Sequence, residues 1–408
     1  MADFKPFNAI RPKKGLESRV AALPYDVLSF EESKKLGEDR YSFIHVDRAE
    51  IDMPEGTDPY DKNVYLKAKE NLETLILEGA LIKEDKPCFY IYRLQSNGKT
   101  KTGIVGLASI YDYTRGLIKK HELTRADKEE DRTNHVDICN AHTGPIFLIS
   151  KDNKNLSDIT EGFIKDNAPI YDFVDKDGVC QKVWAISDEK TINDIIKKFE
   201  QIKDLYIADG HHRNAAALNT AKRRRERGEK SDCENYLAVV FQESELEILP
   251  YNRLLKDLNG NTSEDLIEKI SRNFIVLKAD KTNIASKKHE FGLYVNGQWF
   301  SLLAKEEIIS KDPVKSLDVS ILQDYILFPI FGILDPRINE RIDFAGGTKG
   351  NKYLTDMVDS GEFAAAFSLF PTSVSELMEI SDNNMIMPPK STWFSPKLLS
   401  GLFIHSLE

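Results

Sequence analysis

The chain has 408 residues, of which 41% are apolar and 30% are charged, and its formal net charge is −10. This length and composition predict a soluble globular protein of about two or three domains. The negative charge disfavours nonspecific binding to nucleic acid. No apolar run reaches the roughly 18 residues that a membrane span needs, and no signal-peptide core is evident. Four widely spaced cysteines favour reduced thiols in a cytoplasmic protein over a zinc site or disulfides.

The first segment with a chemical pattern is AALPYDVLSFEES, residues 21–33. Asp26 ends an apolar run after the turn-forming Pro24, and Glu31 and Glu32 follow at a predicted helix start. A carboxylate at such a junction can accept a proton or bind a metal. A simple turn cap explains Asp26 equally well, so the pattern alone leaves both interpretations open.

Periodicity predicts several regular elements further along the chain. Residues 61–83 have apolar side chains at helical spacing, which predicts an amphipathic helix. Residues 144–150 predict a buried strand. β-Hairpins are predicted at three dipeptide turns: Asn97-Gly98, Asp177-Gly178 and Asn296-Gly297. The irregular alternation of these elements predicts an α+β fold and not a regular parallel array.

Residues 119–135, KKHELTRADKEEDRTNH, combine an HExT sequence with a predicted helix. The HExT sequence brings together an imidazole, a carboxylate and a hydroxyl at His121, Glu122 and Thr124. It is not the HExxH zinc motif, because the second histidine is missing at the required spacing. If a helix begins at Asp127, one face carries Lys128, Asp131, Arg132 and His135. A surface helix with many salt bridges would have the same pattern, so both interpretations stay open.

The most informative segment is YIADGHHRNAAA, residues 206–217, which predicts a strand, a tight turn and an alanine-rich helix. The turn carries Asp209, Gly210, His211, His212 and Arg213. A helix N-terminus attracts anions because its first amides lack intrahelical partners. Arg213 can grip a phosphate with two N–H groups, and Asp209 can hold a metal or take a proton. The alternative is that Asp209 caps the helix and the histidines face solvent.

The composition changes after about residue 250, although no linker or repeat marks a sharp boundary. We expect residues 1–250 to form the catalytic core and residues 251–408 to form an α/β part that closes the site. Within this part, residues 335–350 contribute two arginines and a flexible glycine pair at Gly346-Gly347. This combination of residues occurs in many loops, so it is only weak evidence for a binding site.

The C-terminal string MPPKSTWFSPKLLSGL, residues 387–402, holds cations and hydroxyls between prolines. No regular helix can form there until Pro396 is passed. A rigid loop with these groups suits a phosphate, although the glycines of a Walker A loop are absent. The groups in question are Lys390, Ser391, Thr392 and Lys397. A solvent-exposed turn is the equally strong alternative.

Four motifs in this order, PYDV, HExT…KEEDR, DGHHR and PPKSTxFxPK, resemble one large uncharacterised family over essentially the whole chain. Within it, the DGHHR segment resembles the phosphate loops of sulfiredoxin and the ParB fold. It is also similar to the DGHHR motif of the archaeal free-serine kinase. The resemblance implies a ParB/sulfiredoxin-like mixed-sheet core that binds phosphate. His211 stands where sulfiredoxin has its reactive cysteine, which argues against a sulfinic-acid reductase.

The resemblance also implies an activity, namely phosphorylation of free L-serine to O-phospho-L-serine with Mg²⁺ as cofactor. Carried over by position, Asp209 and His211 are catalytic groups, and Asp209 is also the metal ligand. Asp26 or Glu31/Glu32 matches the N-terminal acid of that kinase by region only, and we take Asp26 and Glu32 as the further catalytic candidates. For phosphate and substrate binding, the resemblance implies Gly210, His212 and Arg213. The HExT…KEEDR and PPKST segments have no counterpart in the serine kinase, and their own cations and hydroxyls suggest His121, Glu122, Thr124, Lys128, Arg132, Lys390, Ser391, Thr392 and Lys397 as further binding residues. We expect the three segments around residues 119–135, 206–217 and 387–397 to converge on one cleft.

The phosphoryl donor stays open between pyrophosphate, ADP and ATP, with a slight preference for a compact polyphosphate. A phosphoserine or nucleotide phosphohydrolase is the enzymatic alternative. A nucleotide- or phosphate-sensing module without turnover is the alternative from another class. The expected partners are the small-molecule substrate and the donor, without nucleic acid or membrane, and a homodimer is left open.

Overall fold

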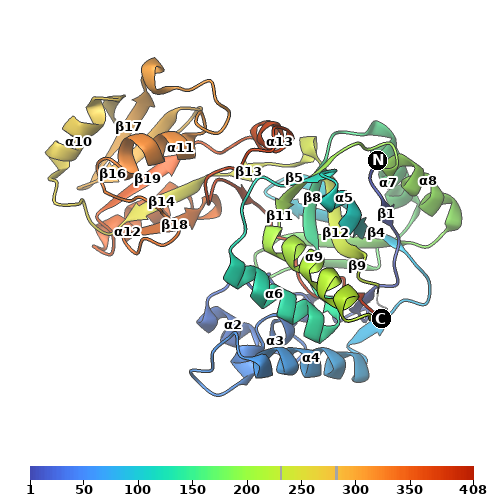
Figure 1. The fold of residues 1–408 in the computed structure, drawn as a ribbon. Helices are drawn as coiled ribbons and strands as arrows, with labels where there is room; N and C mark the ends of the chain where they lie inside the picture. The colour runs from blue at the N-terminus through green and yellow to red at the C-terminus, as the bar shows by residue number, and fades with distance from the viewer. Residues whose placement is uncertain (230–231, 281–283) are drawn as a thin grey trace. The chain divides into compact units, whose positions relative to one another are not determined.

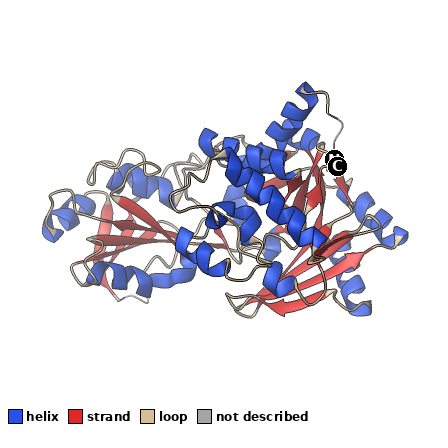
Figure 2. Cartoon of the chain, turned by 90° about the horizontal axis from the view of Figure 1, so that it is seen from below, coloured by secondary structure: helices blue, strands red, loops and turns tan. Residues whose placement is uncertain are grey.

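The computed structural model describes residues 1–229, 232–280 and 284–408, which form two compact units. The first unit comprises residues 1–120, 124–246 and 396–408, and the second comprises residues 121–123 and 247–395. The last residues of the chain therefore belong with the N-terminal half. The sequence alone groups them with the C-terminal part, and the predicted division into a catalytic core and a closing part stays a prediction. Figure 1 follows the chain from blue to red, and helices pack against the strands of each unit (Figure 2).

The first unit is built on a nine-stranded mixed sheet with the order β6-β11-β8-β12-β5-β4-β10-β9, in which β1 also pairs with β5. Its strands are β1 (Phe4–Lys5), β4 (Phe89–Ser96), β5 (Lys99–Ser109), β6 (Ile118–Lys119), β8 (Ile146–Ser150), β9 (Tyr171–Val174), β10 (Cys180–Ile186), β11 (Leu205–Asp209) and β12 (Asn235–Gln242). The β8–β12 and β6–β11 pairs are parallel, and the other pairs are antiparallel. This mixed architecture confirms the predicted combination of helices with a mixed sheet, whereas the ParB/sulfiredoxin classification stays a prediction.

Two short strand pairs and a set of helices complete the first unit. The pairs are β2 (Ile10–Pro12) with β3 (Leu81–Lys83), and β7 (Ala141–His142) with β21 (His405–Ser406). The helices are α1 (Glu17–Val20), α2 (Phe30–Leu36), α3 (Ile44–Asp47), η1 (Ala49–Asp52), α4 (Lys62–Leu77), α5 (Ile110–Thr114), α6 (Ala126–Cys139), α7 (Lys154–Asp166), α8 (Glu189–Phe199), α9 (His211–Glu226) and η2 (Glu243–Glu245). Helix α6 packs against α9 and α4 (Figure 1).

The predicted helix over residues 61–83 is shorter in the structure. Helix α4 ends at Leu77, because Gly79 adopts a left-handed φ of 71° and the chain then enters β3. Its apolar stripe of Val64, Ala68, Leu72 and Leu75 is buried, as the helical spacing predicts. The three predicted hairpins are confirmed, and the glycine of each dipeptide turn has positive φ.

The second unit contains a six-stranded antiparallel sheet with the order β15-β17-β16-β19-β14-β18. The strands of this sheet are β14 (Tyr251–Leu255), β15 (Phe274–Ala279), β16 (Glu290–Val295), β17 (Gln298–Ala304), β18 (Ile342–Gly346) and β19 (Ala365–Leu369). The second unit also contains a separate antiparallel pair of the strands β13 (Ile248–Leu249) and β20 (Trp393–Phe394). Its helices are α10 (Ser263–Ser271), η3 (Glu306–Ile308), α11 (Asp318–Leu322), η4 (Gln323–Leu327), η5 (Gly347–Lys349), α12 (Gly350–Asp359) and α13 (Val374–Asp382). Among the described residues of both units, no helix is long and apolar enough to cross a membrane.

Candidate functional site

The segment from residue 206 to 217 folds as a strand, a turn and a helix, as its sequence predicts. Strand β11 ends at Asp209, Gly210 adopts a left-handed φ of 94°, and α9 begins at His211. Gly210 is the N-cap, and no side chain caps the helix. The alternative in which Asp209 caps α9 is therefore wrong. The N-terminal end of α9 adds partial positive charge to this turn.

Two cations approach the Asp209 carboxylate from different parts of the first unit. Arg213 Nη2 lies 3.4 Å from Oδ2, and Lys397 Nζ lies 3.5 Å from Oδ1. Burial alone would raise the pKa of Asp209, but the charges of Lys397, Arg213 and His211 outweigh it and lower the pKa to about 2. Asp209 is therefore ionised at neutral pH and holds both cations in place. Part of the predicted convergence is thus present, because residues 206–217 meet Lys397.

A small cavity of about 20 Å³, partly open to solvent, lies beside this turn in the first unit. Its lining includes Tyr25, Asp47, Arg132, Thr143, Arg213 and Ser400. Arg213 also donates through Nη1 to Pro145 O at 2.6 Å, which fixes the guanidinium at the pocket wall. Residues from the PYDV, KEEDR and DGHHR motifs therefore meet at one cavity.

Arg132 reaches the pocket from α6, and contacts with Asp131 and Tyr25 hold its side chain in place. Its Nε and Nη2 donate to Asp131 at 2.9 and 3.1 Å, and its Cζ lies 4.0 Å from the centre of the Tyr25 ring. Tyr65 Oη donates to the same Asp131 carboxylate at 3.0 Å. Arg132, Asp131 and His135 are all buried. The surface-helix interpretation of this face is therefore wrong, although Lys128 at its exposed end only donates to Tyr60 Oη.

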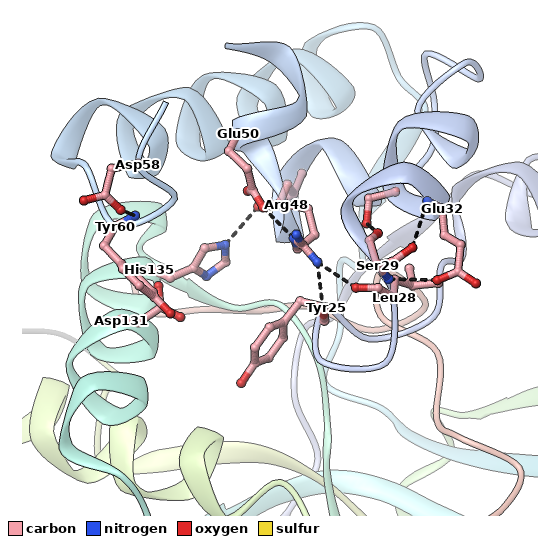
Figure 3. Close-up of polar contacts among 12 residues, drawn as sticks. Tyr25, Leu28, Ser29, Glu32, Arg48, Glu50, Asp58, Tyr60, Asp131 and His135 are labelled. Atoms are coloured by element: carbon pink, nitrogen blue, oxygen red, sulfur yellow. Dashed lines mark hydrogen bonds and ion pairs between the residues drawn. The ribbon is translucent and has the colours of Figure 1, made fainter. Parts of the chain in front are cut away.

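The PYDV turn is held by a separate arginine. Arg48 Nη1 donates to Leu28 O at 2.9 Å and to Tyr25 O at 3.3 Å, and its Nε bonds to Glu50 (Figure 3). These contacts fix the backbone from which the Tyr25 ring extends towards Arg132. A local network thus positions an aromatic ring that no sequence motif for phosphate binding would indicate.

The carboxylates predicted near the N-terminus differ in how they are used. Glu32 forms a capping box with Ser29, since each side chain accepts from the backbone N–H of the other residue (Figure 3). Asp26 is exposed, and no hydrogen bond or ion pair occupies its side chain within the described ranges. The two acids are therefore not equivalent, because the structure of α2 already uses Glu32.

His212 is the histidine of the turn whose pKa is affected by the charge of Asp26. Burial lowers the pKa of His212, and the charge of Asp26 opposes this shift. The Nδ1 atom is buried and has no hydrogen-bond partner in the described part of the chain. His212 is therefore neutral at pH 7 and has a nitrogen available to a ligand. His211, at the first position of α9, is itself buried.

Several pocket residues escaped the sequence prediction. Asp47 is buried on α3 and accepts a hydrogen bond from Thr143 Oγ1 at 3.1 Å. His135, predicted on the same helix face as Arg132, also lines this pocket: its Nε2 lies 3.0 Å from Val46 O, and burial lowers its pKa. Ser400 belongs to the returning C-terminal segment. These residues form no motif in the sequence. Asp47 and Thr143 lie in the short sequences HVD and HTG, where polar residues interrupt apolar runs. This interruption was the one feature of the sequence that could have indicated them.

The remaining predicted residues divide between the two units. Thr124 belongs to the first unit and bonds to Glu129 at the start of α6. His121, Glu122, Lys390, Ser391 and Thr392 belong to the second unit. Within that unit Met387 N donates to His121 O at 2.8 Å, so the HExT start and the PPKST loop are adjacent. Convergence of these residues with Arg213 stays a prediction.

Gly210→Ala should disturb this site through Arg213. A Cβ atom at Gly210 would lie 3.2–3.3 Å from the Arg213 guanidinium, and the left-handed backbone would add about 1–2 kcal/mol of strain. Gly228→Ala is the matched control, because Gly228 has φ of 70° and nothing within 4 Å of its Cβ position. We expect similar losses of melting temperature in both variants but weaker phosphate binding only in Gly210→Ala. Equal phosphate affinities in calorimetry would contradict this expectation.

Comparisons with known proteins place the chain in a family but give little further detail. No curated protein matches the sequence. Solved structures that resemble it include a free serine kinase in complex with AMP, with 13% identity and a TM-score of 0.37 over 72% of this chain and 88% of that one. A conserved hypothetical protein from Pyrococcus furiosus gives 13% and 0.35 over 71% and 92%. C-terminally truncated SbnI from Staphylococcus aureus gives 9% and 0.38 over 72% and 85%.

A family model, in contrast, matches more than half of the chain in sequence. The model described as a protein of unknown function, DUF1015, matches residues 4–320. These residues include the PYDV, HExT, KEEDR and DGHHR motifs, and they stop before the PPKST loop. The chain therefore belongs to the DUF1015 family.

Proposed function

We propose that this protein is a phosphotransferase that phosphorylates the hydroxyl of a small molecule, with free L-serine as the best candidate acceptor. The observation that carries the proposal is that Arg132 and Arg213 come from two helices to line one pocket. Beside them α9 begins without a side-chain cap. Phosphoryl transfer depends mainly on positioning and charge neutralisation, which such a set of donors supplies. The choice of serine rests on the DGHHR resemblance.

In the proposed reaction, the serine Oγ attacks the terminal phosphorus of the donor. A new O–P bond forms while the P–O bond to the leaving phosphate or nucleotide breaks, and the hydroxyl proton passes to a carboxylate. Asp26 suits this proton transfer best, because it is exposed and its side chain has no partner in the described ranges. Asp209 suits it less, since its low pKa makes it a weak proton acceptor. Asp209 instead positions Arg213 and Lys397.

The residues of the first unit do not provide a dedicated Mg²⁺ site around Asp209. One oxygen of this carboxylate faces Lys397 and the other faces Arg213, so two cations already occupy its surroundings. Magnesium in such enzymes is held largely by the phosphates of the substrate and by water. We therefore derive no step from a protein-bound metal, and Mg²⁺ would arrive with the donor.

The decisive assay incubates the purified protein with Mg²⁺, L-serine and each of pyrophosphate, ADP and ATP, and measures phosphoserine by mass spectrometry. We expect product with at least one donor. Phosphate release without an acceptor would favour a phosphohydrolase, and donor binding without turnover would favour a sensing module. Absence of product with every donor and every hydroxyl amino acid would falsify the proposal.

Arg213→Ala should weaken donor binding in this assay. The loss of a charge-assisted contact to phosphate costs about 1.5–3 kcal/mol, which corresponds to roughly a 10- to 150-fold higher donor KM. Arg223→Ala is a suitable control on the same helix, because Arg223 bonds to Glu130 and Asn134 and not to the pocket. An unchanged donor KM in Arg213→Ala would remove Arg213 from the donor site.

A further inference from the structure

Arg253 in the second unit is a buried cation without a counter-charge. It lies on β14 and is only 3% exposed. Its Nη1 donates to Tyr251 O, and its Nη2 donates to Lys390 O at 3.0 Å. A guanidinium has five N–H groups, so three have no acceptor within the described ranges. No carboxylate of those ranges lies within ion-pair distance of it.

The other deeply buried arginines of this protein are paired differently. In the first unit Arg132 bonds to Asp131, and Arg224 bonds to Asp137 at 2.9 Å. Burial lowers the pKa of Arg253 to about 10, which still leaves the guanidinium charged at neutral pH. A buried charge without an opposite charge is costly, and two backbone carbonyls offset only part of this cost. An anionic ligand would supply the opposite charge that Arg253 lacks.

A second cation, Lys390, lies close to Arg253 at an aromatic pair. Its Cζ lies 5.2 Å from the Phe344 ring centre, and the Phe344 and Tyr251 rings are 5.8 Å apart. Lys390 Nζ lies 5.5 Å from the Tyr251 ring centre, and Lys390 is exposed. Both cations therefore border one aromatic pair. Lys390 also has a left-handed φ of 59°, a strained conformation that the bond from Arg253 to its carbonyl helps to hold.

We propose that Arg253 and Lys390 form a binding site for a phosphate group within the second unit. The guanidinium supplies fixed N–H donors for two oxygens, and the exposed Lys390 ammonium supplies a second positive charge. The phosphate belongs either to inorganic phosphate or pyrophosphate or to an adenine nucleotide. The site consists only of residues of the second unit, and it does not depend on the proposed transfer reaction.

The experiment locates an oxyanion directly. Crystals of the full-length protein are soaked in tungstate, whose anomalous signal marks the bound ion. We expect a tungsten peak within hydrogen-bonding reach of the Arg253 guanidinium. Lys390→Asn should remove or strongly weaken the peak, because asparagine tolerates the left-handed backbone but lacks the ammonium. Lys315→Asn, at another exposed lysine of this unit, should leave the peak unchanged.

Solution titrations distinguish the sources of the phosphate. In the Arg213→Ala background, calorimetry with phosphate, pyrophosphate, AMP and ADP should reveal one retained site, which Lys390→Asn weakens about tenfold or more. Clearly tighter binding of ADP than of pyrophosphate assigns the site to a nucleotide, and the reverse assigns it to an inorganic anion. No tungsten peak at Arg253, or equal affinities with and without Lys390→Asn, would overturn the proposal. Arg253 would then serve only to hold the loop carbonyls.

Discussion

Asp209→Asn should reduce turnover by about a hundredfold or more while the fold stays intact. The Asp209 carboxylate holds Arg213 and Lys397 at 3.4 and 3.5 Å, and a neutral amide loses the attraction to both. Misplaced cations stabilise the transition state poorly, because their benefit depends on preorganised geometry. Steady-state phosphoserine formation measures the effect. Because Asp209 positions Arg213 and Lys397, which would contact the phosphoryl donor, we expect a raised donor KM together with a lower kcat.

Asp204→Asn is the matched control for this experiment. Asp204 precedes β11 and pairs with Lys119 at 3.1 Å, away from the pocket lining. We expect it to lose an ion pair without loss of turnover. Near-normal turnover in Asp209→Asn would instead show that the two cations keep their places without it.

The pH dependence of stability separates the structural part of this effect. The pKa of Asp209 in the folded protein, about 2, is below its ordinary value, so ionised Asp209 stabilises the fold above pH 4 or so. This contribution is lost as the pH falls towards 2. The difference in melting temperature between wild type and Asp209→Asn should therefore be largest near neutral pH and shrink in acid.

Arg132→Met should lower the free energy of unfolding by about 3–5 kcal/mol, because it leaves the buried Asp131 carboxylate without its ionic partner. Tyr65 Oη would then provide the remaining hydrogen bond from a side chain. Urea denaturation measures the loss. Substrate binding should weaken as well, since the Tyr25 ring loses the guanidinium that lies against it.

The double variant Asp131→Asn/Arg132→Met tests this explanation. Removing both charges avoids an uncompensated buried ion, so most of the lost stability should return while the weakened binding persists. A double variant that is no more stable than Arg132→Met would show that packing of the long side chain matters more than the ion pair. Arg125→Met, which breaks an exposed pair with Asp127, should change stability by less than about 1 kcal/mol.

The sequence predicted those parts of the fold that depend on neighbouring residues. The turn at Asn97-Gly98 and the strand–turn–helix around Gly210 follow from backbone preferences that few residues besides glycine and asparagine share. The site beyond that turn depends on distant partners. The contact between Arg132 and Tyr25 joins segments with no shared pattern, so no spacing could have predicted it.

Arg253 illustrates the same limit more strongly. The sequence YNRLL gives no indication that its arginine is buried or that it lacks a carboxylate. Both properties arise from the sheet pairing of β14 and from the PPKST loop, whose carbonyl at Lys390 it binds. The residues of the PPKST loop are enough to predict a binding loop, whereas the sequence does not reveal that Arg253 is buried beside it.

The return of residues 396–408 to the first unit affects how the protein is made. Lys397 reaches Asp209, and β21 pairs with β7, only after the chain has passed through all of the second unit. Many multidomain proteins fold their N-terminal domain first during synthesis. Here the ribosome must release residues 396–408 before the first unit can acquire its full set of charges. A chain that stops before residue 396 lacks Lys397 and Ser400 and cannot form the described pocket.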